Sequence, residues 1–369
     1  MTSLLGVSLP VLAAPMAGGP TTPDLVTAAA RAGSLGFLAA GYRTAADLAA
    51  QLDRVEGRFG VNVFAPNPVP VDPSEFRAYA RRLQPEADAY GLNLTDAPIV
   101  EHDDDWPAKI DLLLARPVPV VSFTFALPEA ATVAALRRAG TVVLQTVTST
   151  VEARAAAELG VEGLIVQSSA AGAHSGTFTP TVLPRDVPLP DLVRAVLGVV
   201  GLPVIAAGGV GTADDVTAAL EAGAEAVMVG TALLRTDESG ASAVHKAALA
   251  EAAERAGLAA AGDEPAPAPT AQADDGGLVG TGMWSTVDTV VTRAFSGRPA
   301  RALRNGFVER HDESAPSGYP AVHYLTTPLR RAAAQAGDAE RVNLWAGTGF
   351  RFAGAGSAGA ALERLVAKA

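Results

Sequence analysis

Eight short apolar runs that alternate with helical segments predict an α/β fold: a closed (β/α)8 (TIM) barrel followed by a C-terminal helical appendage. Single helical crossovers between successive strands imply parallel pairing, and eight of them on a chain of 369 residues imply closure into a barrel. Residues 223–230 also resemble residues 160–167, so the same turn-and-strand unit is used twice. The length suits a barrel of about 250 residues with an added segment.

Turn, cap and breaker residues delimit the elements. Strands are expected at residues 11–14, 35–39, 60–64, 118–125, 141–145, 163–167, 204–207 and 227–229. Helices are expected at residues 22–32, 44–55, 73–89, 106–115, 129–139, 151–159 and 212–222. The barrel would occupy residues 1–257, a low-complexity loop or linker residues 258–283, and a helical segment that packs on the barrel residues 284–369.

Composition excludes several classes of protein. The 39 acidic residues outnumber the 28 basic ones, for a net charge of −11, so no basic surface is available for nucleic acid or an anionic membrane. There is no cysteine, which excludes disulfides, cysteine–zinc sites and thiolate nucleophiles. No apolar run approaches the roughly 18 residues of a membrane span, and the proline-interrupted start lacks the basic residues of a signal peptide. We therefore expect a cytoplasmic protein that binds neither nucleic acid nor membrane. The oligomeric state is left open.

Glycines follow two neighbouring predicted strands. Gly208 and Gly209 come after residues 204–207, and Gly230, with Thr231 behind it, comes after residues 227–229. Glycine lets backbone N–H groups approach an anion, and a helix start adds its dipole. Because many TIM barrels bind phosphate after strands 7 and 8, the pair of turns predicts a phosphate-bearing ligand. The alternative is that the glycines only form tight turns.

Active-site residues of such barrels follow the strands, and His174 is the histidine that does so here. It lies in the small-residue loop 168–176, where its imidazole can accept or donate a proton or supply a charge. The alternative is a loop histidine held by backbone groups alone. Asn62, inside an apolar strand, is either held by neighbouring groups or contacts a ligand. The acidic run 101–105 is expected to be solvated surface and not a metal site. No role is expected for the histidines in predicted helices or on the surface: His102, His245, His311 and His323.

Six motifs, in order along the chain, carry a family resemblance. They are APMAGG (14–19), SFTF (122–125), VQSSAAGAHSG (166–176), LPVIAAGGVGTADDVTAALEAGAEAVMVGTALL (202–234), TRAFSGRPARALRN (292–305) and NLWAGTG (343–349). Together they resemble the nitronate monooxygenase family, formerly called 2-nitropropane dioxygenases. The resemblance covers nearly the whole chain apart from the low-complexity stretch.

The resemblance implies an FMN-dependent oxidoreductase that uses O₂ to convert alkyl nitronates into a carbonyl compound and nitrite. Position by position, it places Met16 and Ala17 beside the flavin ring, Asn62, Gln145 and Gln167 at its polar edge or ribityl chain, and Gly172, Gly208, Gly209, Gly230 and Thr231 around the ribityl phosphate. His174 would be the catalytic histidine, placing the anionic nitronate. Whether it also removes a proton from a neutral nitroalkane stays open, and no metal is implied.

The loop before His174 departs from the family pattern at two positions. Ala170 stands where the family has glutamate, and Ala173 stands where it has glycine. Two other readings therefore remain. The first is an FMN-dependent NAD(P)H oxidoreductase of the enoyl or quinone reductase type. The second is a non-catalytic flavin-binding protein, in which these two alanines mark lost catalysis.

Overall fold

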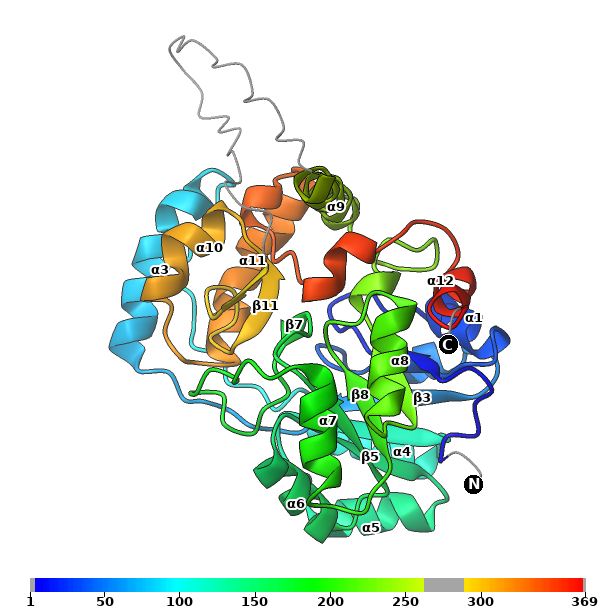
Figure 1. The fold of residues 1–369 in the computed structure, drawn as a ribbon. Helices are drawn as coiled ribbons and strands as arrows, with labels where there is room; N and C mark the ends of the chain where they lie inside the picture. The colour runs from blue at the N-terminus through cyan, green and yellow to red at the C-terminus, as the bar shows by residue number, and fades with distance from the viewer. Residues whose placement is uncertain (1–3, 262–288, 368–369) are drawn as a thin grey trace.

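The computed structural model describes residues 4–261 and 289–367. Its centre is a closed barrel of parallel strands in the order β1-β2-β3-β4-β5-β6-β8-β9 (Figure 1). The barrel strands are β1 (Val11–Ala13), β2 (Gly36–Ala39), β3 (Phe59–Phe64), β4 (Val120–Thr124), β5 (Val142–Val147), β6 (Gly163–Gln167), β8 (Val204–Ala207) and β9 (Ala226–Val229). Every strand predicted from the sequence is present, which confirms the barrel.

Helices follow the barrel strands along the chain. They are α1 (Pro23–Arg31), α2 (Ala45–Leu52), α3 (Pro73–Asp88), α4 (Trp106–Ala115), α5 (Ala130–Arg138), α6 (Thr150–Leu159), α7 (Leu189–Leu197), α8 (Ala213–Glu221) and α9 (Ala243–Ala261). Thr44 and Thr212 begin α2 and α8 with reciprocal capping boxes. No helix was predicted at α7, whose N-cap, Pro188, makes no side-chain cap bond. A missing cap signal explains the omission.

Apolar side chains fill the inside of the barrel and support its carboxyl end. Leu12, Phe37, Leu144, Ile165 and Met228 belong to one buried interior cluster. Ile165 and Met228 also line the cavity described below, so the interior core forms part of its floor. A floor of close-packed side chains holds the strand ends in fixed positions.

The segment after residue 284 contains helices, as predicted, but also two strands that the prediction missed. The helices are α10 (Gly306–His311), α11 (Ala321–Gln335) and α12 (Ala358–Arg364). The strands β10 (Thr289–Thr292) and β11 (Ala300–Leu303) form an antiparallel pair, and β11 also pairs with β7 (Ala173–His174). Four β-branched residues make up β10, which favours a strand. Through β11, this strand pair extends to the loop that carries His174.

The C-terminal segment shares a core with α3. Phe76 and Tyr79 of α3 pack in one buried cluster with Phe295, Phe307 and Leu325, and the Tyr79 hydroxyl donates to the Ala294 carbonyl at 2.6 Å. In Figure 1, α3, α10 and α11 accordingly lie together beyond one end of the barrel. The segment is therefore built into the same body as the barrel.

The stretch predicted as a loop or linker, residues 258–283, lies mostly outside the described residues. Its first part is not loop: α9 continues to Ala261 instead of ending near Gly257. Leucine and alanine at residues 258–261 are strong helix formers, which explains the extension. Among the described residues, no helix combines the length and apolar character that a membrane crossing requires.

Candidate functional site

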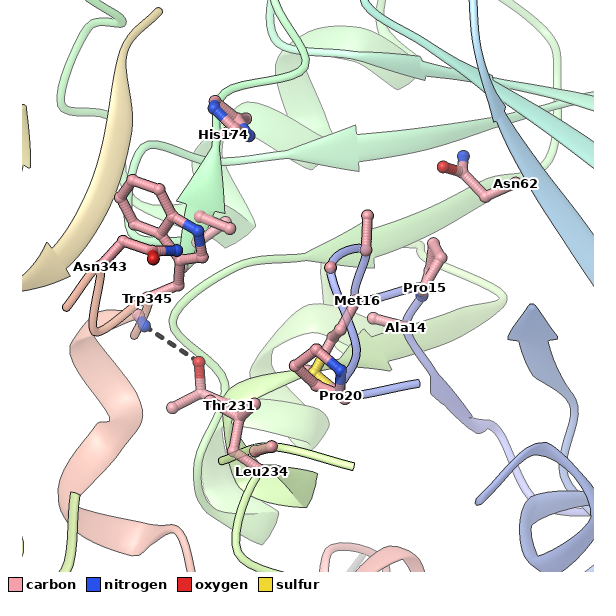
Figure 2. A pocket seen from close by; sticks show the side chains of 18 of the residues that line it. Ala14, Pro15, Met16, Pro20, Asn62, His174, Thr231, Leu234, Asn343 and Trp345 are labelled. Carbon is pink, nitrogen blue, oxygen red and sulfur yellow. Dashed lines mark hydrogen bonds between the residues drawn. The ribbon is translucent and has the colours of Figure 1, made fainter. Parts of the chain in front are cut away.

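A cavity of about 430 Å³ lies at the carboxyl ends of the barrel strands. Its walls come from segments that follow β1, β4, β6, β8 and β9, and from α9, α11 and residues 342–349. Figure 2 shows Met16, Asn62, His174 and Thr231 around this space, each from a different loop or strand. All the predicted site residues except Gln145 line it: Met16, Ala17, Asn62, Gln167, Gly172, His174, Gly208, Gly209, Gly230 and Thr231.

Gln145 is the predicted site residue that does not line the cavity. Its side chain is fully buried, and its Nε2 donates to the carbonyls of Phe123 at 3.3 Å and Ala126 at 3.2 Å. Successive residues of a strand face opposite sides, and the next residue, Thr146, is the one that lines the cavity. The predicted flavin contact of Gln145 therefore has no support in the geometry. The amide braces the loop after β4.

The glycines after β8 form a cradle with no room for side chains. A Cβ atom on Gly208 would lie 2.7 Å from Ser168 Oγ, and one on Gly209 would lie 2.8 Å from the Ala170 Cβ. Both glycines have positive φ, at 108° and 79°. In the described part of the chain, no acceptor receives the backbone N–H of Gly209 or of Gly230. Free N–H groups beside close-approach glycines fit an anion such as a phosphate.

A C-terminal loop completes this cradle. The Gly347 N–H donates to Thr231 Oγ1 at 2.9 Å (Figure 2), and the Thr348 N–H donates to the Ala170 carbonyl at 3.0 Å. A Cβ on Gly172 would lie 2.6 Å from the Gly347 nitrogen. Residues 346–349 therefore press directly on the loop after β6. The motif NLWAGTG marked this stretch in the sequence, but no side-chain type in it predicted the contact.

The side-chain amides of Asn62 in β3 and Gln167 in β6 have different roles. Asn62 Nδ2 donates to Ser122 Oγ at 3.0 Å and Thr124 Oγ1 at 2.9 Å. Its Oδ1 accepts no hydrogen bond from the described residues, and because Asn62 lines the cavity this oxygen can accept a ligand N–H. Gln167 instead uses both ends on the histidine loop: Nε2 donates to the His174 carbonyl at 3.3 Å, and Oε1 accepts the Gly176 N–H at 2.7 Å. Gln167 thus holds the loop in shape.

His174 is held inside an aromatic enclosure. Its ring lies 5.9 Å from Phe125, 5.6 Å from Tyr319 and 5.5 Å from Trp345, centroid to centroid. Burial, with smaller contributions from the Arg298 and Arg330 guanidiniums, lowers the pKa of His174 to about 3. At neutral pH the imidazole is therefore uncharged and available as a proton acceptor.

The residue before His174 is strained. Ala173 has φ of 62°, in the left-handed region that favours glycine. The Ala173→Gly variant should therefore gain about 1 kcal/mol in free energy of unfolding, since relief of strain exceeds the entropy cost of glycine. Urea unfolding of the two proteins measures the gain. In the control, Ala139→Gly at φ −76°, stability should fall by about 0.5–1 kcal/mol. Equal losses in both variants would contradict the strain argument.

Two histidines that were expected to have no role also line the cavity. His245 of α9 donates from Nε2 to the Trp345 carbonyl at 3.1 Å, and burial lowers the pKa of His245 to about 4. His323 of α11 stacks on Tyr42 at 4.1 Å between centroids, with the rings nearly parallel. The expectation was wrong because α9 and α11 fold over the strand ends. Neither histidine follows a barrel strand in sequence.

Two carboxylates of the acidic run 101–105 bind neighbouring backbone and side-chain groups. The Asp104 carboxylate accepts the Tyr42 N–H at 2.8 Å and pairs with the fully buried Lys109 at 2.7 Å. Asp105 accepts the Ala45 N–H at 2.7 Å. These bonds hold Tyr42, whose φ is 64°, against His323. The run therefore positions one wall of the cavity.

The cavity is positively charged although the chain is acidic. Within the described residues no aspartate or glutamate lines it, whereas Arg330 and Arg331 do. Burial lowers the pKa of Arg330 to about 10, so its guanidinium remains charged at neutral pH. Its Nη1 donates to Asn343 Oδ1 at 3.0 Å and its Nε to Thr326 Oγ1 at 3.0 Å, neither of which neutralises the charge. A cavity of this kind favours anionic ligands.

The buried histidines predict that acid destabilises the fold. Burial lowers the pKa of His174 to about 3 and of His245 to about 4, against about 6.5 for an unfolded histidine. Between these values the unfolded chain binds protons that the folded chain does not, so the free energy of unfolding falls as the pH drops from about 6.5 toward 4. Urea unfolding at about pH 8 and pH 5 measures the difference.

Two variants separate this contribution from that of the carboxylates. His245→Gln should show a smaller loss of stability between the two pH values than the unmodified chain. Val151→Gln should show the same loss as the unmodified chain, because Val151 is an exposed residue of α6 and the change alters no titratable group. An unchanged loss in His245→Gln would contradict the assignment.

The sequence is similar to those of named proteins over nearly its full length. A family profile described as nitronate monooxygenase matches residues 1–260 and 283–368. A probable nitronate monooxygenase of Staphylococcus saprophyticus is 32% identical, over 100% of this chain and 97% of the relative. One of Staphylococcus aureus is 33% identical, over 96% of this chain and 92% of the relative.

Solved structures agree. A nitroalkane oxidase from Streptomyces ansochromogenes is 41% identical, with a TM-score of 0.83, over 98% of this chain and 96% of that one. FabK from Thermotoga maritima is 25% identical, with a TM-score of 0.69, over 99% of this chain and 94% of that one. Profile, relatives and fold all cover nearly the full length. The chain therefore belongs to the nitronate monooxygenase family, a family of oxidoreductases.

Proposed function

We propose that this chain binds FMN and uses O₂ to oxidise alkyl nitronates to a carbonyl compound and nitrite. The observation that carries the proposal is a cavity that two arginines and, among the described residues, no acidic side chain line, beside a buried neutral histidine. A nitronate is an anion, and such a cavity attracts it despite the acidic character of the chain as a whole. The likeness to named nitronate monooxygenases and to a nitroalkane oxidase supports the same substrate class.

The residues present fit the cofactor. The backbone N–H groups of Gly209 and Gly230, in a cradle too tight for side chains, would hold the phosphate. Asn62 Oδ1 would accept an N–H from the polar edge of the ring, and Met16 would pack beside it. When bound, FMN supplies the redox chemistry; the protein supplies position and electrostatics. His174 would face the substrate from the aromatic enclosure, which keeps water from the reacting atoms.

Absorbance spectroscopy of the purified protein tests this function. One anaerobic cuvette receives propionate 3-nitronate and the other NADPH. Loss of the flavin absorbance with nitronate alone, reversed by air with release of nitrite, is the expected result. A protein purified without flavin would contradict the phosphate assignment. A flavin that responds to neither reagent would favour a non-catalytic flavin-binding protein.

The second candidate is an FMN-dependent NAD(P)H oxidoreductase of the enoyl or quinone reductase type. The likeness to FabK from Thermotoga maritima favours it, at lower identity and TM-score than the nitroalkane oxidase. Rapid reduction by NADPH in the second cuvette, with no response to nitronate in the first, would move the assignment to this function.

A further inference from the structure

The motif TRAFSGRPARALRN contains a serine in contact with the proposed catalytic histidine. Ser296 is buried, and its Oγ lies 2.8 Å from His174 Nε2. The same Oγ lies 3.2 Å from the Arg298 carbonyl, toward which it donates. Ser296 is therefore placed between the ring and a backbone acceptor.

The proton count at Ser296 decides which ring nitrogen carries hydrogen. A serine hydroxyl has one proton to donate. Ser296 is the hydrogen-bond donor to the Arg298 carbonyl among the described residues, and a buried carbonyl without a donor is unfavourable. With its proton on that carbonyl, the oxygen must accept from His174 Nε2–H. The neutral imidazole then carries its lone pair on Nδ1.

Nδ1 is the nitrogen that remains open to the cavity. It has no hydrogen-bond partner in the described chain, and it is not among the fully buried polar atoms that lack one. His174 lines the cavity, so a ligand can reach this nitrogen. A lone pair there can take a proton from a carbon acid, whereas an N–H there could not.

The same C-terminal segment also holds the histidine backbone. His174 pairs with Ala300 in β11, and the Ser175 N–H donates to the Pro299 carbonyl at 2.9 Å. The Arg298 guanidinium lies 3.9 Å from the centre of the Phe125 ring, and its Nε donates to the Ser175 carbonyl at 3.2 Å. Main chain and ring are thus fastened to residues 296–300. The backbone of His174 and the hydroxyl that its ring contacts therefore belong to one connected unit.

We propose that Ser296 is a positioning residue that fixes His174 as its Nε2–H tautomer and presents Nδ1 as the proton acceptor. Building on the proposed function, this gives Ser296 a part in the proton transfer by which a neutral nitroalkane becomes a nitronate. The Nδ1 lone pair takes the Cα proton, and the electrons of that C–H bond become the C=N bond of the nitronate. His174 becomes imidazolium beside the anion it has produced. No oxidant is required for this step.

The tautomer is measured directly by NMR on the full chain as purified, labelled with [¹⁵N]histidine. The His174→Gln variant identifies the His174 signals among those of the five histidines. The expected spectrum has a protonated Nε2 and an unprotonated Nδ1. In Ser296→Ala this pattern should change to a mixture of tautomers. A protonated Nδ1 in the unmodified chain, or an unchanged spectrum in Ser296→Ala, would overturn the proposal.

Kinetics provide a second readout. In Ser296→Ala, kcat/KM for a neutral nitroalkane should fall about 10- to 100-fold, and that for the same compound supplied as its nitronate should fall less. The control is Ser34→Ala, which removes a buried hydroxyl that donates to the Val11 carbonyl at the other end of the barrel; it should leave both values unchanged. Equal falls for both substrates would indicate a merely structural serine. The NMR result stands even if the chain oxidises neither compound, so the two proposals fail separately.

Discussion

Replacement of His174 by alanine should lower kcat with nitronate by about 10²- to 10⁴-fold while the protein keeps its flavin. The loss is expected because the imidazole lines the cavity from the aromatic enclosure of Phe125, Tyr319 and Trp345, where it would place the anionic nitronate. Flavin is expected to remain because the phosphate cradle is made of backbone groups on β8 and β9, not of this ring. Steady-state assays of nitrite release and the flavin-to-protein absorbance ratio measure the two effects.

The control is Arg194→Ala. Arg194 is exposed on α7, pairs with Asp191 of the same helix at 2.9 Å and does not line the cavity, so kcat and flavin content should both equal those of the unmodified enzyme. A His174→Ala protein with unchanged nitronate kinetics would remove the central role assigned to this histidine. A protein that loses flavin together with activity would show that the ring supports the cofactor and not the reaction.

Replacement of Gly230 by aspartate should expel the flavin. The position suits the test because a Cβ there would meet only ordinary contacts, 3.6 Å from the Ala14 Cβ and from Met16 Sδ, and its φ of −115° suits any residue. The change then adds chiefly a negative charge where the phosphate is proposed to bind. At Gly209, by contrast, a Cβ would lie 2.8 Å from the Ala170 Cβ. A loss of flavin there could result from steric crowding as well as from charge.

Gly230→Asn is the control, because it has nearly the shape of aspartate without its charge. The Asn variant should keep most of its flavin, whereas the Asp variant should purify nearly colourless and regain flavin only at high added FMN. Titration of both apoproteins with FMN, followed by flavin fluorescence, gives the two dissociation constants. Equal affinities in the two variants would mean that the phosphate lies elsewhere.

The barrel and its strand ends were readable from the sequence because their signals are local. The threonine caps of α2 and α8, the apolar runs of the strands and the glycines after β8 and β9 lie within a few residues of what they determine. Once the barrel order is known, the side chains after each strand must converge on one end. His174, Asn62 and Gly209 were therefore placed in the cavity without coordinates.

Side-chain direction was less accessible. Gln145 and Thr146 are neighbours in one strand, and the sequence alone favoured the amide as the ligand contact. The barrel closes so that Thr146 faces the cavity and Gln145 faces away. A shift of one residue reverses the face of a strand, and polarity does not reveal which face is inside.

The sequence was sufficient for the barrel, the glycine turns after β8 and β9 and the family, since each rests on patterns within one or two elements. The tertiary structure was required for everything that the C-terminal segment adds to the cavity. Its cavity-lining residues do not follow a barrel strand in sequence: His323 and Arg330 lie in α11, and Trp345 comes after that helix. Ser296 contacts His174, which is 122 residues away along the chain. Such contacts follow from how α9, α11 and β11 fold over the barrel mouth. Long-range packing of this kind depends on shape and burial, which local periodicity does not encode.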